Sequence, residues 1–462
     1  MSSDTVMRMA LDMSALDGLD KLVFDWLQSH FGHAPSAFYR QLRWRIGWEA
    51  NVEIDGEVRG ILVRGSRGQD HKSPMTMQQE AAAQQIMERH GVLAPHVYGM
   101  IENPLAIVME RLPGGINSAL IEDDAARWKV RKEFVEALAK LHAIPVAEFA
   151  AIGMQVPTTA EDLALNLYRP CIDIVRERLG ERPFPLVEFF ARWLEANAPK
   201  DRARAGFVTG DAGQFLYDGD RFTGLIDFEV SYIGDPAAEF AGMRLRNTTE
   251  PLGDISLLRE YYESLTGDSI SRTAIAYHSA GFAGTNSMLM WPMMFAPEVE
   301  NDYVAYLQFC VATSRWGLQG IAESLNVALE IVPDPKPNAT VPFEAAPGQL
   351  LNLLTGWQSD DTALRFHLEG AAALATYLGR CHVYGGSILA ADLADATALT
   401  GKAISSRDEA DAAVQAFVEQ AGREDDTKLV AFFNRWLSRQ NFLLKGCGSQ
   451  AYLTETTLQP IR

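Results

Sequence analysis

The stretch TGDAGQFLYDGDRFTGLIDFE, residues 209–229, holds two aspartates, Asp211 and Asp227, sixteen positions apart. Between them, FLYD and RFTGLID flank a D-G-D turn, a pattern typical of a tight β-hairpin. A hairpin returns its two outer ends to the same edge, so we expect both carboxylates to face one small volume. Carboxylates held that close raise one another's pKa unless a cation or a shared proton relieves the repulsion.

Aspartates at turns and strand ends are most often solvated, and that is the plain alternative for both residues. The neighbouring residues favour chemistry instead. Gly210 and Gly213 permit backbone shapes closed to other residues, and the strand that delivers Asp227 is apolar. Phosphoryl transfer needs one acid to orient a hydroxyl and another to hold a divalent metal on a triphosphate. Gln214 offers a further oxygen to such a metal.

The composition excludes several classes of protein. With 462 residues, 47% hydrophobic and 22% charged, the chain has the length of two or three soluble domains. No apolar run reaches membrane-spanning length, and the acidic N-terminus does not resemble a secretion signal, so we expect a cytoplasmic protein. The four cysteines form no C-x-x-C pair, which indicates neither a zinc site nor a dithiol. A formal charge of −19 argues against nucleic acid or an anionic membrane as partner.

Pattern changes along the chain predict an α+β organisation. After an N-terminal segment, residues 1–19, strand-like runs around a D-G turn, an Ala- and Gln-rich helix and the strand LAIVME fill residues 20–113. Residues 114–331 are mostly helical, with a capping box from Thr158 to Glu161 and the quoted hairpin. A proline-rich linker, 332–347, precedes a helical extension, 348–462, whose aromatic stripe at helical spacing is typical of a core.

Three motifs make the chain recognisable: T-G-D at 209–211, I-D-F-E at 226–229 and G-D-P at 234–236. In order and spacing they resemble the signature of the aminoglycoside phosphotransferase family, small-molecule kinases related to protein kinases. The resemblance covers roughly residues 20–245 and is nearest to the branch found beside acyl-CoA dehydrogenases. It implies a bilobal protein-kinase-like fold, with an antiparallel-sheet N-lobe over 20–113, a mostly helical C-lobe over 114–331, and an added C-terminal helical domain.

The resemblance also implies ATP and Mg²⁺ as cofactors and a hydroxyl-bearing small molecule as acceptor. Asp211 matches the catalytic residue, and Gln214 and Asp227 match the magnesium ligands. The nucleotide-binding positions matched are the phosphate-contacting Arg64, its ion-pair partner Glu80, and the adenine hinge Met109, Glu110 and Arg111. The acceptor could be an aromatic, phenolic or hydroxyacyl compound, since the Met- and Trp-rich residues 284–318 would suit an apolar pocket; core packing is the alternative.

Two departures from the family pattern favour a second hypothesis. Thr209 replaces the family's histidine and could supply one of its hydrogen bonds, and the loop after Asp211 is two residues short, with Gln214 where asparagine is usual. The alternative function is therefore a catalytically weak, nucleotide-binding kinase-like subunit or scaffold. A homodimer or a partner subunit could form through the C-terminal helices. GSRGQDHKS, residues 65–73, has the wrong spacing for a P-loop and is expected to be a turn.

Overall fold

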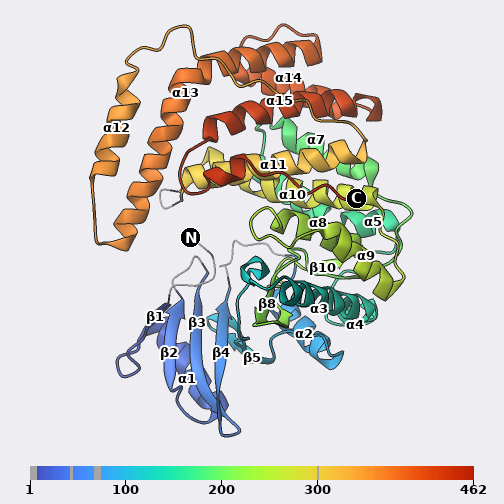
Figure 1. Ribbon diagram of the computed structural model, residues 1–462, viewed down its shortest axis with the longest axis vertical. Coiled ribbons are helices and arrows are strands. Elements are labelled where there is room, and N and C mark those ends of the chain that lie inside the picture. Colours follow the sequence, from blue (N-terminus) through green and yellow to red (C-terminus); the bar gives the residue numbers. More distant parts are fainter. Residues whose placement is uncertain (1–7, 42–44, 67–73, 299–300) are drawn as a thin grey trace. The chain divides into compact units, whose positions relative to one another are not determined.

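The computed structural model describes residues 8–41, 45–66, 74–298 and 301–462, and its chain divides into two compact units (Figure 1). The first, here called the sheet unit, comprises residues 1–163, 202–270 and 461–462. The second, the helical unit, comprises residues 164–201 and 271–460. Most of the segment 65–73 lies outside the described residues. In the part of the chain that the structure describes, no helix is long and apolar enough to cross a membrane.

A six-stranded antiparallel sheet begins the sheet unit, in the order β1-β2-β3-β4-β6-β5. The strands are β1 (Arg8–Ala10), β2 (Ala37–Gln41), β3 (Gly47–Ile54), β4 (Glu57–Gly65), β5 (Val97–Glu102) and β6 (Leu105–Glu110). The predicted D-G turn is confirmed: Asp55 and Gly56 have φ of 53° and 83°, and Ile54 pairs with Glu57. Left-handed φ at both central positions matches the twist of the two strands, which is why Asp-Gly stands there.

The two faces of the sheet bury different elements. Trp48, Ala50 and Val52 of β3 pack on α1 (Gly18–Phe31), where Val23 and Leu27 are fully buried. On the other face a cluster joins Leu62 of β4, Met109 of β6 and Ala81 of α2 (Met77–Arg89). Side chains alternate along a strand, so Leu62 places Arg64 on this second face, toward α2. The sheet thereby sets the position of the predicted phosphate contact.

The helix α2 is fixed at its start by a capping box. The Thr76 hydroxyl accepts from the N–H of Gln79, and the Gln79 side chain accepts from the N–H of Thr76. Both bonds satisfy backbone donors that a helix otherwise leaves unpaired. Glu80 follows at once, in the first turn, and is buried. A carboxylate is favourable at the positive end of the helix dipole, and the cap holds it in register with the sheet.

The rest of the sheet unit is mainly helical and carries the quoted hairpin. Its elements are η1 (Ser118–Leu120), α3 (Asp124–Ala143), α4 (Val146–Ala150), β7 (Gly206–Val208), β8 (Phe215–Asp218), β9 (Arg221–Leu225), β10 (Tyr232–Gly234), α8 (Ala237–Arg246) and α9 (Ile255–Thr266). The hairpin prediction is confirmed, since β8 and β9 pair from Phe215 with Leu225 to Asp218 with Arg221. β7 pairs with β10 beside it.

One predicted cap is wrong by a residue. The pair Thr158 and Glu161 was expected to begin a helix, but the hydroxyl of Thr159 accepts from the N–H of Asp162. The helix α5 (Ala160–Leu165) begins directly after Thr159. Both threonines precede an acid by three positions, so the sequence contains two overlapping boxes and only the backbone path decides between them.

The helical unit is built around the antiparallel pair α10 (Arg272–Phe295) and α11 (Tyr303–Ser324). Its other elements are α6 (Tyr168–Leu179), α7 (Pro185–Asn197), α12 (Ala345–Gly356), α13 (Thr362–Thr400), α14 (Arg407–Gln420), η2 (Arg423–Asp425), α15 (Asp426–Leu444) and η3 (Ala451–Thr454). The aromatic stripe of α15 is buried, which confirms it as core. Residues 327–344 form neither helix nor strand, as their prolines predict. Residues 271–331, predicted in the C-lobe, group with the C-terminal helices.

Gly114 joins the chain leaving the sheet to the hairpin, and its replacement tests this junction. It has φ +110°, and an added Cβ would lie 1.8 Å from the carbonyl oxygen of Tyr217. The next residue, Gly115, exchanges two backbone hydrogen bonds with Tyr217, so neither strand can move aside easily. We expect Gly114→Ala to lower the free energy of unfolding by about 1–3 kcal/mol in urea titrations.

The control is Gly219→Ala in the hairpin turn, where φ is +59° and no atom lies within 4 Å of the new Cβ. It carries the backbone cost alone, about 1 kcal/mol. Equal losses for both variants would show that the contact at Tyr217 does not matter.

Candidate active site

The hairpin brings the two predicted carboxylates together. Asp211 follows β7 and Asp227 follows β9, and the side chain of Gln214 lies between them. Its amide nitrogen Nε2 is 2.7 Å from Asp211 Oδ2 and 3.2 Å from Asp227 Oδ2. From a loop that is two residues short, the side chain of Gln214 therefore reaches both carboxylates. Turning the amide over would present its oxygen to the same space, because the two ends of an amide have nearly the same shape.

Unusual backbone conformations hold both ends of the hairpin. Asp227 has φ +61°, a left-handed conformation that few residues other than glycine adopt and that aspartate tolerates best. Gly210, just before Asp211, has φ +81°, and a Cβ there would lie 2.4 Å from the carbonyl oxygen of Val230. Strained conformations persist where the surrounding structure imposes them, and they cluster at functional sites.

Two arginines from the sheet side reach the I-D-F-E stretch. Arg64 Nη1 lies 3.1 Å from Asp227 Oδ1, and its other terminal nitrogen forms an ion pair with Glu80. The Arg64–Glu80 pair that the family resemblance implies is thus formed. Arg45 forms an ion pair with Glu229, and both side chains are about one-tenth exposed. Ion pairs buried this far are costly to break because the remaining charge would be left without compensation.

A third arginine, Arg246, was not foreseen. It is the last residue of α8, forms an ion pair with Asp211, and lies 3.4 Å from Glu250. Gly213 has φ +98°, and a Cβ there would come within 3.1 Å of the Arg246 stem, so the glycine leaves room for it. The spacing of Arg246 and Glu250 suits a helical ion pair, but nothing in the sequence relates either residue to Asp211.

The charge of Asp211 is set by opposing influences. Burial raises the pKa of its carboxyl above the ordinary value. Arg246 lowers it, Asp227 raises it, and the amide of Gln214 lowers it slightly, with a net rise. A carboxylate of raised pKa binds a proton more readily, which suits a residue that takes one from a hydroxyl.

Thr209 is braced more firmly than its sequence predicts. Its backbone N–H donates to Glu239 Oε1 at 2.7 Å, and its hydroxyl donates to Glu239 Oε2, also at 2.7 Å. Its carbonyl accepts from the hydroxyl of Ser231 at 3.0 Å. Glu239 is fully buried in the first turn of α8. Three hydrogen bonds therefore fix the residue before the Gly210–Asp211 turn, without an imidazole at position 209.

An imidazole enters the same network from another helix. His142, near the end of α3, is buried, with Nε2 at 3.3 Å from Glu239 Oε1 and Nδ1 at 2.8 Å from the hydroxyl of Tyr262. The chain Thr209–Glu239–His142–Tyr262 links the catalytic loop, α8, α3 and α9. The sequence does not reveal this network, since residues this far apart show no mutual spacing.

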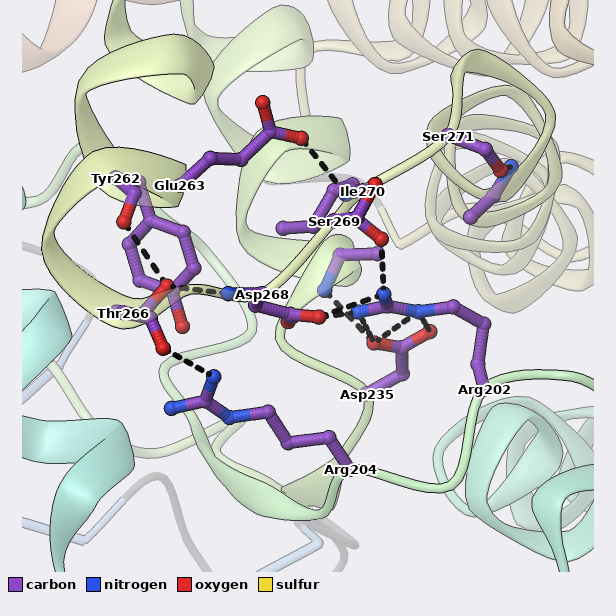
Figure 2. Close-up of polar contacts among 12 residues, drawn as sticks. Arg202, Arg204, Asp235, Tyr262, Glu263, Thr266, Asp268, Ser269, Ile270 and Ser271 are labelled. Carbon is purple, nitrogen blue, oxygen red and sulfur yellow. Dashed lines mark hydrogen bonds and ion pairs between the residues drawn. The ribbon is translucent and has the colours of Figure 1, made fainter.

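The G-D-P motif holds the start of α8. Asp235 Oδ1 accepts from the N–H of Ala237 at 3.0 Å, so this aspartate braces the first turn of the helix. Arg202 donates two-pronged to Asp235 and also contacts both oxygens of Asp268, while its Nη1 donates to the carbonyl of Ser269 at 2.7 Å (Figure 2). This network anchors the helix that carries Glu239 at one end and Arg246 at the other.

The predicted adenine hinge, residues 109–111, already uses its backbone N–H groups in hydrogen bonds with neighbouring segments of the sheet unit. The N–H of Glu110 donates to His96 O at 2.8 Å, and the N–H of Arg111 donates to Gly60 O at 2.9 Å. The Arg111 side chain crosses Gly60 to Glu49 Oε2, 2.8 Å away. Met109 is buried. A nucleobase at this segment would therefore meet its carbonyl oxygens, because both N–H groups already have acceptors.

Glu49 is the centre of a polar cluster that also includes Arg111 of the predicted hinge. The sequence did not reveal this cluster. Glu49 accepts from Gln41, Arg8 and Arg111 at 2.7–3.0 Å. Burial raises the pKa of its carboxyl, but these three hydrogen bonds outweigh burial and the net pKa is lowered. Strand alternation hides this cluster, since Glu49 reads as one polar residue among apolar ones.

Comparison with known proteins gives one family. The model described as "Phosphotransferase enzyme family" matches residues 43–269, which include every predicted site residue. No curated protein matches the chain in sequence. The match includes strands of the six-stranded sheet as well as the hairpin, so it does not rest on the three short motifs alone. Neither comparison bears on the branch associated with acyl-CoA dehydrogenases, which stays a prediction.

Solved structures give the fold. A candidate aminoglycoside phosphotransferase of Ralstonia eutropha JMP134 superposes with TM-score 0.50 at 15% identity, covering 67% of this chain and 98% of its own. Macrolide 2'-phosphotransferase MphH of Brachybacterium faecium gives 0.43 at 16% identity, covering 63% and 97%. A thermostable mutant of aminoglycoside phosphotransferase APH(4)-Ia, in ternary complex with AMP-PNP and hygromycin B, gives 0.43 at 16%, covering 64% and 98%. The predicted kinase-like α+β fold is confirmed.

The raised pKa of Asp211 predicts a pH-dependent gain of stability in Asp211→Asn. A carboxyl whose pKa is raised on folding stabilises the folded state while protonated, and this contribution is lost as pH rises through the folded pKa. Asparagine keeps the uncharged shape, so the variant should melt at higher temperature than the parent near neutral pH. The difference should vanish below the ordinary aspartate pKa. Thermal melts across this pH range measure it.

Asp218→Asn, an exposed aspartate of the same hairpin, controls for the loss of one negative charge. A lower melting temperature for Asp211→Asn at neutral pH would mean that its ion pair with Arg246 outweighs burial.

Proposed function

Residues 43–269 belong to the phosphotransferase enzyme family, and from this premise we propose that the protein is an ATP-dependent kinase of small-molecule hydroxyl groups. The observation that carries the proposal is the placement of Gln214 within hydrogen-bonding distance of both Asp211 and Asp227. The amide of Gln214 then separates Asp211, proposed to face the acceptor, from Asp227, proposed to bind the metal. That separation is what in-line phosphoryl transfer needs, because the attacking hydroxyl and the triphosphate must meet between them.

Asp211 is the residue we assign to the acceptor. Its raised pKa suits it to take the hydroxyl proton as the oxygen attacks phosphorus. Its ion pair with Arg246 fixes the carboxylate, and the network behind Thr209 fixes its backbone. Positioning supplies most of the rate enhancement in phosphoryl transfer, so rigid support of this residue matters as much as its basicity.

Asp227 and Gln214 fit a magnesium ion. Both offer hard oxygen atoms, and Mg²⁺ in kinases is held by one or two such protein ligands together with phosphate oxygens. Bound Mg²⁺ would neutralise the charge of the phosphates. Arg64, already 3.1 Å from Asp227, would contact the phosphates, with Glu80 keeping its guanidinium in place. The segment Met109 to Arg111 would receive the adenine, as the family resemblance implies.

For the acceptor we propose an aromatic, phenolic or hydroxyacyl compound. The choice rested on the apolar residues 284–318, and these belong to the core of the helical unit: Met288, Trp291 and Trp316 are buried there. The family match supports a small molecule with a hydroxyl group and does not select among acceptors. A screen of hydroxylated metabolites for ATP consumption identifies the acceptor directly.

A second candidate function is a nucleotide-binding, kinase-like subunit without transfer activity. One observation favours it: the carboxylate of Asp211 is already engaged by both Arg246 and Gln214. Both contacts are made to Oδ2, so a hydroxyl directed to that oxygen would compete with them. Thermal shift with ATP, with and without Mg²⁺, followed by an assay for ATP turnover, separates the two functions: binding without turnover under every acceptor favours the subunit.

The metal assignment predicts the behaviour of Asp227→Ala. The parent should be stabilised more by ATP with Mg²⁺ than by ATP alone, and the variant should lose that difference because its metal ligand is gone. Turnover of Mg-ATP should fall about a hundred- to a thousandfold, the scale of losing an electrostatic stabiliser of the transition state. Asp218→Ala, on the same hairpin, is the matched control. Retained turnover in Asp227→Ala would remove the assignment.

The pairing of Arg246 with Asp211 predicts a shift in the pH profile. Arg246 lowers the pKa of Asp211, so Arg246→Met should raise that pKa further. Asp211 acts only when ionised, so the acidic limb of turnover should move to higher pH. Arg246→Lys, which keeps the charge, should move it less. The profile is measured over about pH 5–9 with any accepted substrate.

Lys129→Met is the control, because Lys129 forms an exposed ion pair with Asp220 of the same hairpin. It removes a cation outside the site and should leave the acidic limb in place. An unchanged limb in Arg246→Met would show that Asp211 is not the group that titrates.

A further inference from the structure

The helical unit carries an exposed apolar surface on the hairpin of α12 and α13. In Figure 1, α12 lies alongside the first part of α13, on the side away from α14 and α15. None of the twelve residues of α12 is buried. Seven large hydrophobic side chains on α12, on α13 and just before α12 are at least 46% exposed, and one of them is Phe366. The other six are together called the hairpin face: Phe343, Leu350, Leu353, Trp357, Leu364 and Leu378.

The hairpin face is contiguous by helical spacing. Leu350, Leu353 and Trp357 follow one another at intervals of three and four, so they share one side of α12 and its C-terminal cap. Leu364 and Leu378 of α13 are fourteen residues apart, close to four whole turns, and therefore also share a side. Scattered exposed leucines need no explanation, but a continuous row on two adjacent helices does.

One end of the hairpin face is hollow and the other end projects. The hollow is a groove of about 340 Å³. It is lined by Pro342, Phe343, Ala346, Pro347, Leu350, Ala375, Leu378 and His382. Trp357, 64% exposed, lies seven residues beyond Leu350, on the order of 10 Å along the helix. The surface thus offers a pocket at one end and a large aromatic side chain at the other.

The charge of α12 and its C-terminal cap differs from that of the chain. Residues 345–357 contain no charged side chain, in a chain whose formal charge is −19. Depletion of charge marks the centre of subunit interfaces, and those of homodimers are the more apolar class. Two acidic chains repel each other over most of their surface, and an uncharged face is where they could approach.

We propose that the hairpin face is the interface of a homodimer, in which two copies pack α12 and α13 antiparallel about a two-fold axis. This arrangement places Trp357 of each copy against the groove of the other. A two-fold interface must be self-complementary, and a groove and a projecting aromatic at opposite ends of one surface meet that condition. The short α12, none of whose residues is fully buried within its own chain, gains the tertiary packing that helices of its length need.

The area of the hairpin face agrees with a stable dimer. Six large side chains of roughly 150–250 Å² each, which are 46–88% exposed, give on the order of 600 Å² per copy. Two copies would bury about 1,200 Å², above the roughly 1,000 Å² expected of a specific interface. This proposal is independent of the kinase function, since all its residues belong to the helical unit.

The test is the mass of the full chain in solution. Light scattering after gel filtration, at about 1–100 μM, should give twice the chain mass of 51.0 kDa. Leu353→Glu and Leu364→Glu each place a charge in the interface and should give the single-chain mass. Leu257→Glu is the matched control, because Leu257 of α9 and Leu364 are both 48% exposed; it should remain dimeric. Circular dichroism of each variant establishes that it is folded.

Ala346→Trp tests the antiparallel arrangement, since it fills the groove without removing any exposed apolar side chain. It should dissociate the dimer as Leu353→Glu does. A parent of single-chain mass at the highest concentration overturns the proposal, whether or not the protein binds another partner. So does a dimer that survives both glutamate variants, or one that Leu257→Glu also dissociates. Dissociation by Leu364→Glu but not by Ala346→Trp overturns the antiparallel packing.

Discussion

The repulsion between Asp211 and Asp227 is the constraint on which the catalytic part depends. Two carboxylates that share one amide, Gln214, cannot both stay ionised without compensating charge. The compensation comes from opposite sides: Arg64 meets Asp227 from the sheet, and Arg246 meets Asp211 from α8. Each arginine is held by a second acid, so the site is a chain of alternating charges.

The alternating charges of the site are held in place by further polar groups that are buried around it. Thr209 and Glu239 fix the backbone behind one carboxylate, and Asp235 with Arg202 anchors the start of α8. Buried polar groups are expensive unless fully hydrogen-bonded, and here they connect elements far apart in sequence. The hairpin alone could bring two acids near one another. Holding them at a fixed separation requires the helices on which these groups sit.

The proposed active site and the proposed dimer interface belong to different units of the chain. Every predicted site residue belongs to the sheet unit, whereas the hairpin face belongs to the helical unit. The helical unit also contains α10 and α11, which the sequence assigned to the lobe of the hairpin. Local sequence pattern predicts where helices form. It does not predict which apolar faces of different helices pack together.

The sequence by itself determined the hairpin and the D-G turn, because short-range rules of turns and strands act within a few residues. The roles proposed for Asp211, Gln214 and Asp227 come from family resemblance. The resemblance also identified the pair of Arg64 with Glu80. Only the tertiary structure decided that Gln214 reaches both carboxylates and that Arg246 holds Asp211. These contacts depend on loop conformation and on helix ends brought together across long stretches of chain, and neither leaves a periodic trace in the sequence.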